Sequence, residues 1–367
     1  MAKKRRKSSS KIFIILFVLV VICVVALFIV KPEVFKSITN LFNKKDNQTT
    51  INSDDLTIHF LELGVKNTGD SIYIKAGDTD ILIDAGSTKE SASTITKYLN
   101  QYVTDGKLEY VIATHGDKDH ISAFVGPKGE SGVLDSFKVD TIIDFPRTTK
   151  TTTIYKDYVA KRENLVKQGA KHFTALECFN NENGAKRIYE LSKGIELEFL
   201  YNKFYEENTT DENNNSVCLM INQGSRHFLF TGDLEKEGEE ALVKNNKLPE
   251  VELFKAGHHG SKTSSNDSLL SVIKPKIVCV CCCAGSDEYT KIDDNMFPTQ
   301  AFISRVCKYT DKVYVTSLAT EDQSSFTSMN GNIVVTSKKD QEVMVNCSNN
   351  NTILKDTEWF KKHRKWE

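Results

Sequence analysis

The chain has 367 residues, and its 48 basic and 49 acidic side chains leave a formal net charge of −1. Hydrophobic residues make up 40% and charged residues 26%, which is the composition of an ordinary globular protein with one large or two small domains. A net charge this close to zero argues against a surface adapted as a whole to nucleic acid, so any such binding must come from a local patch.

The N-terminus combines a basic cluster with a long apolar run. Residues 1–11 hold several lysines and arginines, and residues 12–30 are apolar throughout. That run is close to the ~20 residues that cross about 30 Å of hydrocarbon. It ends in Lys31 and Pro32 rather than in a small-residue cleavage site, so we expect an uncleaved signal anchor rather than a cleaved signal peptide. The basic residues predict a single-pass protein of the cell membrane with a cytoplasmic N-terminus and an extracellular body.

A polar segment follows the apolar run. Residues 31–55 are rich in Asn, Thr, Lys, Asp and Ser and show little periodicity, so we expect a linker. The main domain is expected over residues 56–348. Its first predicted elements are strands at 56–63, 71–75 and 79–83, a helix at 87–100 and a strand at 108–113.

The next segment concentrates residues that bind metal ions. His115, Asp117, Asp119 and His120 lie within six residues, after a β-prone apolar run and before a predicted helix. A single histidine in such a place is more often a core or surface residue, whereas two imidazoles and two carboxylates together are typical ligands of a divalent ion. The sequence therefore predicts a metal site at the end of this strand.

Further candidate ligands follow other predicted strands. Asp84, Asp233 and the adjacent His258 and His259 each come directly after an apolar run. Functional groups from separate strand ends commonly converge at one edge of a sheet, so we expect these groups to join the first cluster. The remaining predicted elements are strands at 139–145, 195–201, 217–222, 228–230, 251–255, 276–283, 312–317, 332–337 and 342–346, with helices at 154–168, 235–244 and 300–309. Two series of strands, each followed by helices, predict two stacked sheets with helices outside.

Two other features concern cysteines and the C-terminus. Four of the nine cysteines crowd residues 279–283, where they are expected to be small buried residues of a strand rather than a disulfide framework. Unpaired thiols are unusual outside the cell, which is in tension with the predicted topology. Residues 349–367 are expected to form a basic, solvated tail.

The motifs, in this order, resemble the metallo-β-lactamase superfamily, and within it the soluble domain of ComEC-type competence proteins, which share the segment Gly257–Ser261. The resemblance covers about residues 56–346. It implies an α/β fold, a four-layer αββα sandwich with the site at one edge.

The resemblance also implies a set of roles. His115 and Asp117 would hold one metal ion, His120 and His258 a second with Asp119, and Asp233 would bridge the two. As catalytic residues, Asp119 would position the nucleophile, and His259 or a metal-bound water would protonate the leaving group. The other candidate residues are Asn215, Ser261 and Lys262 for the substrate, Lys118 and Lys255 beside the ligands, and Asp70 and Asp84 as structural neighbours.

The sequence departs from the common pattern H-x-H-x-D-H. Asp117 stands at the second histidine, as in ComEC-type domains, and the third ligand of the first ion is absent, with only residues 212–215 available. A set rich in carboxylates favours Mn²⁺ or Mg²⁺ without excluding Zn²⁺. We therefore expect two divalent ions, Mn²⁺ or Zn²⁺.

These features predict a membrane-anchored, metal-dependent hydrolase, specifically a phosphodiesterase or nuclease that acts on extracellular DNA, single-stranded DNA included, or on another phosphodiester polymer. One alternative is hydrolysis of a wall-linked phosphoester or a lactone by the same site. A second is a catalytically impaired metal-binding module. Besides the membrane and the substrate, the sequence indicates no obligate protein partner.

The predicted topology can be tested on intact cells. Because residues 31–55 should form an accessible linker outside the membrane, added protease should release the main domain into the medium. Immunoblotting of cells and medium measures the release. Protection of the domain until the cells are lysed would place it on the cytoplasmic side.

Overall fold

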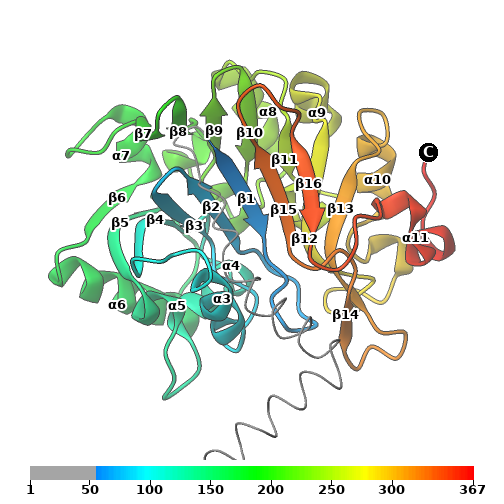
Figure 1. Cartoon of the computed structure of the whole chain (residues 1–367), viewed down its shortest axis with the longest axis horizontal. Coiled ribbons are helices and arrows are strands. Elements are labelled where there is room, and N and C mark those ends of the chain that lie inside the picture. The colour runs from blue at the N-terminus through cyan, green and yellow to red at the C-terminus, as the bar shows by residue number, and fades with distance from the viewer. Residues whose placement is uncertain (1–54) are drawn as a thin grey trace, which may run out of the picture. The chain divides into compact units, whose positions relative to one another are not determined.

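The computed structural model describes residues 55–367 (Figure 1). The predicted cytoplasmic segment 1–11, the anchor 12–30 and nearly all of the linker 31–55 lie outside the described residues and stay predictions. Within the described part of the chain, no helix is both long and apolar enough to cross a membrane.

Two eight-stranded sheets form the centre of the domain. The first has the order β16 (Met344–Cys347), β15 (Ile333–Ser337), β1 (Leu56–Phe60), β2 (Ile72–Ala76), β3 (Thr79–Ile83), β4 (Lys107–Ile112), β5 (Lys138–Asp144) and β6 (Lys171–Thr174). The second has the order β14 (Phe326–Ser328), β13 (Val313–Ala319), β12 (Ile277–Ala284), β11 (Leu253–Lys255), β10 (Arg226–Phe230), β9 (Leu219–Gln223), β8 (Ile195–Phe199) and β7 (Ile188–Ser192).

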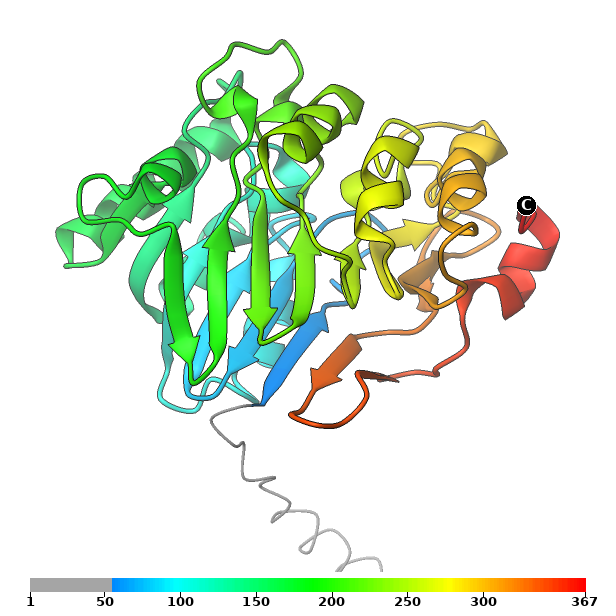
Figure 2. The ribbon, with the colours of Figure 1, turned by 90° about the horizontal axis from the view of Figure 1, so that it is seen from above.

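The helices lie outside the two sheets (Figure 2). They are α3 (Ser91–Leu99), α4 (Lys118–Val125), α5 (Val133–Ser136), α6 (Thr153–Lys167), α7 (Ala175–Asn180), α8 (Lys236–Asn245), α9 (Asp267–Ile273), α10 (Gln300–Val306) and α11 (Glu358–His363). One buried cluster joins the two sheets and the helices α3 and α4, and a second joins the other face of the second sheet to α8, α9 and α10. The predicted two-sheet α/β sandwich is therefore confirmed.

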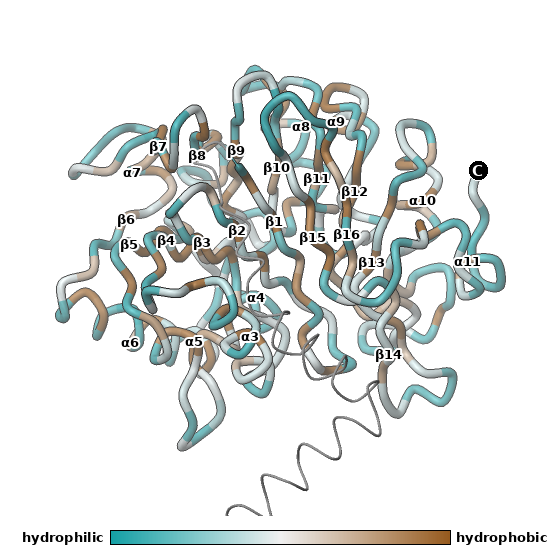
Figure 3. The backbone as a smooth tube through the Cα atoms, in the orientation of Figure 1, coloured by the Kyte–Doolittle hydropathy of each residue, from teal (hydrophilic) through white to brown (hydrophobic). Residues whose placement is uncertain are grey.

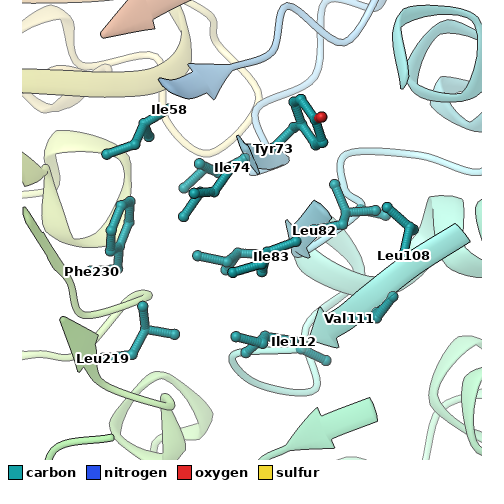
Figure 4. Close-up of a cluster of buried hydrophobic side chains, with 14 of the residues drawn as sticks. Ile58, Tyr73, Ile74, Leu82, Ile83, Leu108, Val111, Ile112, Leu219 and Phe230 are labelled. Carbon is teal, nitrogen blue, oxygen red and sulfur yellow. The ribbon is translucent and has the colours of Figure 1, made fainter. Parts of the chain in front are cut away.

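Alternation of side chains along the strands builds the space between the sheets. Ile83 and Ile112 point towards Leu219 and Phe230 of the opposite sheet, whereas Leu82 lies on the other face of its strand (Figure 4). All five are at most 1% exposed. Apolar residues follow the strands while many of the connecting loops are polar (Figure 3). Burial of each such side chain contributes roughly 1.5–3 kcal/mol, so the pattern fixes which face is inward.

Parallel pairing brings the candidate ligands to one end of each sheet. In the first sheet β3, β4 and β5 are parallel, and in the second β10, β11 and β12 are parallel. The segments that follow β3 and β4 carry Asp84 and residues 114–120, and those after β10 and β11 carry Asp233 and His259. The strand order thus gathers residues from four separate segments.

The C-terminal segment differs from the expected solvated tail. Residues 354–363 form a 3₁₀ turn and α11, and Phe360 packs in the second core. Arg364 is only 5% exposed, and its guanidinium donates hydrogen bonds to the carbonyls of Pro298 (3.0 Å), Met296 (2.9 Å) and Asp293 (2.7 Å). The basic composition of the segment suggested that it is exposed. Arg364 can nevertheless be buried, because all the donors of its guanidinium group form hydrogen bonds.

Replacement of Arg364 by alanine should lower the free energy of unfolding by roughly 2–4 kcal/mol, because three carbonyl groups lose a charged donor. Denaturant unfolding followed by circular dichroism measures the change. Lys365→Ala is the control, since only backbone atoms of Lys365 bond to Gln300. Equal stability of the two variants would show that the segment is not held by Arg364.

Candidate metal centre

Four buried residues from different segments meet at the strand ends. They are Asp70, His120, Asp233 and His259, and one potential ligand atom of each lies within 4.8 Å of all the others. Asp70 follows β1, His120 lies in the first turn of α4, Asp233 follows β10, and His259 follows β11. Carboxylate and imidazole groups in such proximity match the donor set of a divalent ion.

Asp233 lies at the centre of the cluster. Its Oδ2 atom is 3.2 Å from Nε2 of His120 and 3.1 Å from Nε2 of His259. Its other oxygen, Oδ1, accepts a hydrogen bond from Nζ of Lys255 at 3.2 Å. The backbone NH of Asp233 donates to Oγ of Ser216. The carboxylate is therefore fixed with one oxygen directed at the two imidazoles.

Asp84 orients His120 from the far side of the ring. Its Oδ2 atom is 2.7 Å from Nδ1 of His120, and the Thr114 backbone NH and hydroxyl each donate to the carboxylate at 2.7 Å. Nε2 of His120 is thus left to face Asp233. A carboxylate on the outer nitrogen is the usual way in which a protein sets the orientation of a metal-binding histidine. Asp84 supports the site, in the place where the sequence predicted a structural residue.

His259 is held in a similar way by the second sheet. Its Nδ1 atom bonds to the carbonyl of Cys281 at 2.9 Å and lies 3.1 Å from Oδ1 of Asp70. The backbone of His258 and His259 is left-handed, with φ of 46° and 55°. Non-glycine residues rarely adopt that conformation, and it costs about 1–3 kcal/mol where it persists. The strained turn directs the second histidine of the pair into the cluster.

Three buried imidazole nitrogens form no well-aligned hydrogen bond within the described part of the chain, although two of them lie 3.1–3.2 Å from Oδ2 of Asp233. They are the Nε2 atoms of His115, His120 and His259. Buried polar atoms in proteins are almost always satisfied, and exceptions of this kind mark a missing ion or water. A divalent ion satisfies them directly, so the residues present fit a metal ion. His120, Asp233 and His259 would hold it, with Asp70 and Asp119 beside them.

The electrostatic balance also favours a cation. Four carboxylates (Asp70, Asp84, Asp119 and Asp233) and one ammonium group (Lys255) are buried around the cluster. Burial lowers the pKa values of His120 and His259, but nearby carboxylates, Asp233 first, outweigh it, so both pKa values are raised well above the ordinary range. The carboxylates thus stabilise positive charge at the place where these imidazole nitrogens meet.

Lys255 is a buried structural cation, although the sequence raised it as a possible phosphate contact. It is 1% exposed, forms an ion pair with Asp70 and donates to the carbonyl of Gly232 at 3.0 Å. Burial raises the pKa of Asp70, but Lys255 and His259 together lower it to about 2. Lys118, the other flanking lysine, is 62% exposed and points at Glu288.

The expected first-ion position is more open. Nε2 of His115 lies 3.6 Å from Oδ2 of Asp117, and the His115 and His120 rings are 4.1 Å apart. Burial lowers the pKa of His115 to about 3, which keeps the imidazole neutral and able to bind a metal. The second oxygen of Asp117 pairs with Nζ of Lys150 at 2.5 Å. The side chain of Asp117 is 27% exposed, whereas Asp233 is buried.

Residues 212–215, considered for the absent third ligand, have another role. The buried Glu212 accepts hydrogen bonds from the NH of Gly116 at 3.0 Å and the NH of Thr149 at 2.6 Å. Asn215, a predicted substrate contact, donates its side-chain amide to the same carboxylate at 3.2 Å. Glu212 therefore ties the metal-binding segment to the loop that contains Thr149.

The remaining predicted residues lie around the rim. His258 is half-buried, with Nδ1 3.3 Å from Glu235 and Nε2 3.9 Å from Asp233. Ser261 contacts Thr263, and Lys262 is exposed. The structure thus brings His259 rather than His258 into the buried cluster, and adjacent identical residues gave the sequence no means to choose between them.

Asp119 faces the cluster and also contacts a residue that the sequence did not reveal. Its Oδ2 atom is 3.6 Å from Nε2 of His259 and accepts a hydrogen bond from the hydroxyl of Tyr289 at 2.8 Å. Tyr289 and Lys150 lie on loops with no periodic pattern, and no sequence signal marks either one.

The sandwich and the buried aspartate–histidine cluster at the strand ends define a metal-dependent hydrolase of the metallo-β-lactamase fold. A profile of the Metallo-beta-lactamase superfamily matches residues 65–127 and 207–284, the segments that contribute most of the cluster. These two segments are therefore similar to this superfamily, in agreement with the resemblance of the motifs.

Among curated relatives, the chain is similar to proteins of the ComEC type. It is 28% identical over 232 residues to ComE operon protein 3 of Bacillus subtilis (strain 168), which covers 57% of this chain and 26% of the relative. It is 26% identical over 254 residues to Competence protein ComA of Neisseria gonorrhoeae, covering 68% and 30%. The chain therefore spans less than a third of each relative. Among solved structures, YhfI of Bacillus subtilis aligns with a TM-score of 0.42 and 13% identity over 72% of this chain and 96% of that one.

The roles of His258 and His259 can be distinguished by measuring how each substitution changes metal binding. His259→Ala should lower metal affinity by more than about 100-fold, because loss of a ligand exceeds the 10–100-fold effect of an outer partner. Asp84→Asn should lower metal affinity by about 10-fold to 100-fold, and His258→Ala should change it by about threefold or less. Metal titration of the purified chain, with elemental analysis, measures all three. Equal losses in the two histidine variants would contradict the placement of His259.

Proposed function

We propose that this chain is a metal-dependent phosphodiesterase whose substrate is an anionic phosphodiester, single-stranded DNA included. The observation that carries the proposal is the set of buried Nε2 atoms that gather around Asp233 without a well-aligned hydrogen bond, with Asp117 and Asp119 beside them. One similar protein is named a competence protein, which favours a DNA substrate. We further propose that the anchor at residues 12–30 holds the domain outside the cell membrane.

When bound, divalent ions supply Lewis-acid polarisation of a phosphoryl oxygen and a nucleophilic water near neutral pH. The chain's own residues prepare the site for this chemistry. Asp84 orients His120, and the carbonyl of Cys281 orients His259. Lys255 orients the carboxylate of Asp233. Asp119, beside His259, lies where its carboxylate can accept a hydrogen bond from a water.

We propose two ions, held unequally. One ion would be held by Asp233, His120 and His259 and would bind more tightly. The other would lie at His115 and Asp117, which supply fewer ligands. Carboxylates bind hard ions relatively well, so Mn²⁺ should support turnover better than Zn²⁺. The smaller net positive charge of such a site leaves a bound water less acidic, which favours mildly alkaline conditions.

Two alternatives use the same site. One is hydrolysis of a lactone or a wall-linked phosphoester. The other is a metal-binding module without turnover, and the ion pair between Asp117 and Lys150 favours it because that pair opposes binding of a second ion. Two equivalents of bound metal favour catalysis, and one or none favours the module.

The activity is tested on the purified full-length chain after removal of metal by chelation and reconstitution with Mn²⁺ or Zn²⁺. We expect cleavage of single-stranded DNA and of bis(p-nitrophenyl) phosphate, faster with Mn²⁺, and about 100-fold or greater loss in His120→Ala. His227→Ala, on β10 and bonded to Asn222, is the matched control. Hydrolysis of a lactone substrate alone would contradict the proposal, as would full activity in the chelated protein.

A further inference from the structure

Two carboxylates at the start of α4 are each paired with a donor from a distant loop. Nζ of Lys150 lies 2.5 Å from Oδ1 of Asp117, and the hydroxyl of Tyr289 donates to Oδ2 of Asp119 at 2.8 Å. Both carboxylates belong to the segment that follows β4. An ammonium group and a phenol hydroxyl therefore stand beside the metal centre on two different loops.

The loop that carries Lys150 is fixed to the metal-binding segment by a buried carboxylate. Glu212 is 4% exposed and accepts from the hydroxyl of Thr148 at 2.6 Å as well as from backbone NH groups of Gly116 and Thr149. A Cβ atom at Gly116 would lie 2.7 Å from Oε1 of Glu212 and 3.1 Å from Cγ of Lys150. A side chain at Gly116 would therefore displace Glu212 and Lys150, which shows how closely the two segments pack against each other.

The loop that carries Tyr289 is fixed on both sides. Glu288 accepts from the NH of Thr68 at 2.8 Å and from the side-chain amide of Asn67 at 2.9 Å. The ring of Tyr289 packs against Phe297 with a centroid distance of 5.4 Å, and Phe297 lies 5.9 Å from the ring of His259. Contacts outside the candidate metal centre therefore hold the hydroxyl of Tyr289 beside Asp119.

The side chains that carry the two donors are partly exposed. The side chains of Lys150 and Asp117 are each 27% exposed, and Tyr289 is 50% exposed. A fixed, half-open ammonium group gains most from an anionic oxygen, and charge-assisted hydrogen bonds are about twice as strong as neutral ones. A lactone offers a neutral carbonyl, whereas a phosphodiester offers two charged non-bridging oxygens.

We propose that Lys150 and Tyr289 are the substrate-binding donors of this site, and that they bind the non-bridging oxygens of a phosphoryl group. The inference rests on the proposed phosphodiesterase function, and it names the residues that select an anionic substrate. Metal binding to Asp117 and Asp119 weakens the hold of these carboxylates on their present partners, since a ligating carboxylate shares its charge with the cation. The ammonium group of Lys150 and the hydroxyl of Tyr289 can then donate hydrogen bonds to the substrate.

The test is the affinity of the manganese-loaded full-length chain for inorganic phosphate, measured by calorimetry. Lys150→Met should weaken binding on the order of 10-fold to 100-fold, and Tyr289→Phe by about 5-fold, because Lys150 is a charged donor and Tyr289 a neutral one. Lys161→Met and Tyr201→Phe are matched controls, because their groups pair with Asp135 and Glu206 away from the centre. Metal content should be the same in all five proteins.

Unchanged phosphate affinity in both variants would overturn the inference, and so would a loss of metal equal to the loss of phosphate. For a diester substrate, Lys150→Met should raise KM more than it lowers kcat, as expected for a group that binds substrate and transition state alike. A parent protein that binds phosphate through these residues yet cleaves only a lactone would contradict the proposed function while supporting the pair of donors.

Discussion

Compensation of buried negative charge is the constraint on which this structure depends. Asp233 places one oxygen 3.1–3.2 Å from two imidazole nitrogens and the other beside Lys255, and all of these groups are buried. Isolated charges in an interior are prohibitively costly, so each must be paired or bound to a metal. Lys255 compensates part of this negative charge through its ion pairs with Asp70 and Asp233. A divalent cation at the imidazole nitrogens would compensate more of it.

The backbone is shaped to allow that arrangement. A Cβ atom at Gly86 would lie 1.5 Å from the carbonyl oxygen of Asp119, so only glycine permits this contact. The NH of Asp70 donates to that same carbonyl at 3.0 Å, and the NH of Ala85 donates to the carbonyl of His120. Three segments are thereby joined by main-chain bonds, which is a more rigid support than side chains alone provide.

The sequence by itself determined the sandwich and most of the ligand types. Alternation along Leu56–Phe60 and the continuous apolar run of Ile277–Ala284 mark strands by their burial. Four ligating residues within 115–120 are local in sequence, and parallel strands bring their ends to one edge without further information. Asp84 and Asp233 could be predicted for the same reason, since Asp84 directly follows β3 and Asp233 lies shortly after the end of β10.

Only the tertiary structure decided which groups meet. His259 rather than His258 enters the cluster because of a left-handed turn, and periodicity carries no record of that conformation. Tyr289 reaches Asp119 across 170 residues, and Lys150 reaches Asp117 through a loop held by Glu212. The C-terminal segment packs inward because carbonyl groups satisfy Arg364. Hydropathy records whether a residue is buried, but contacts between polar groups on distant loops depend on how the whole chain closes.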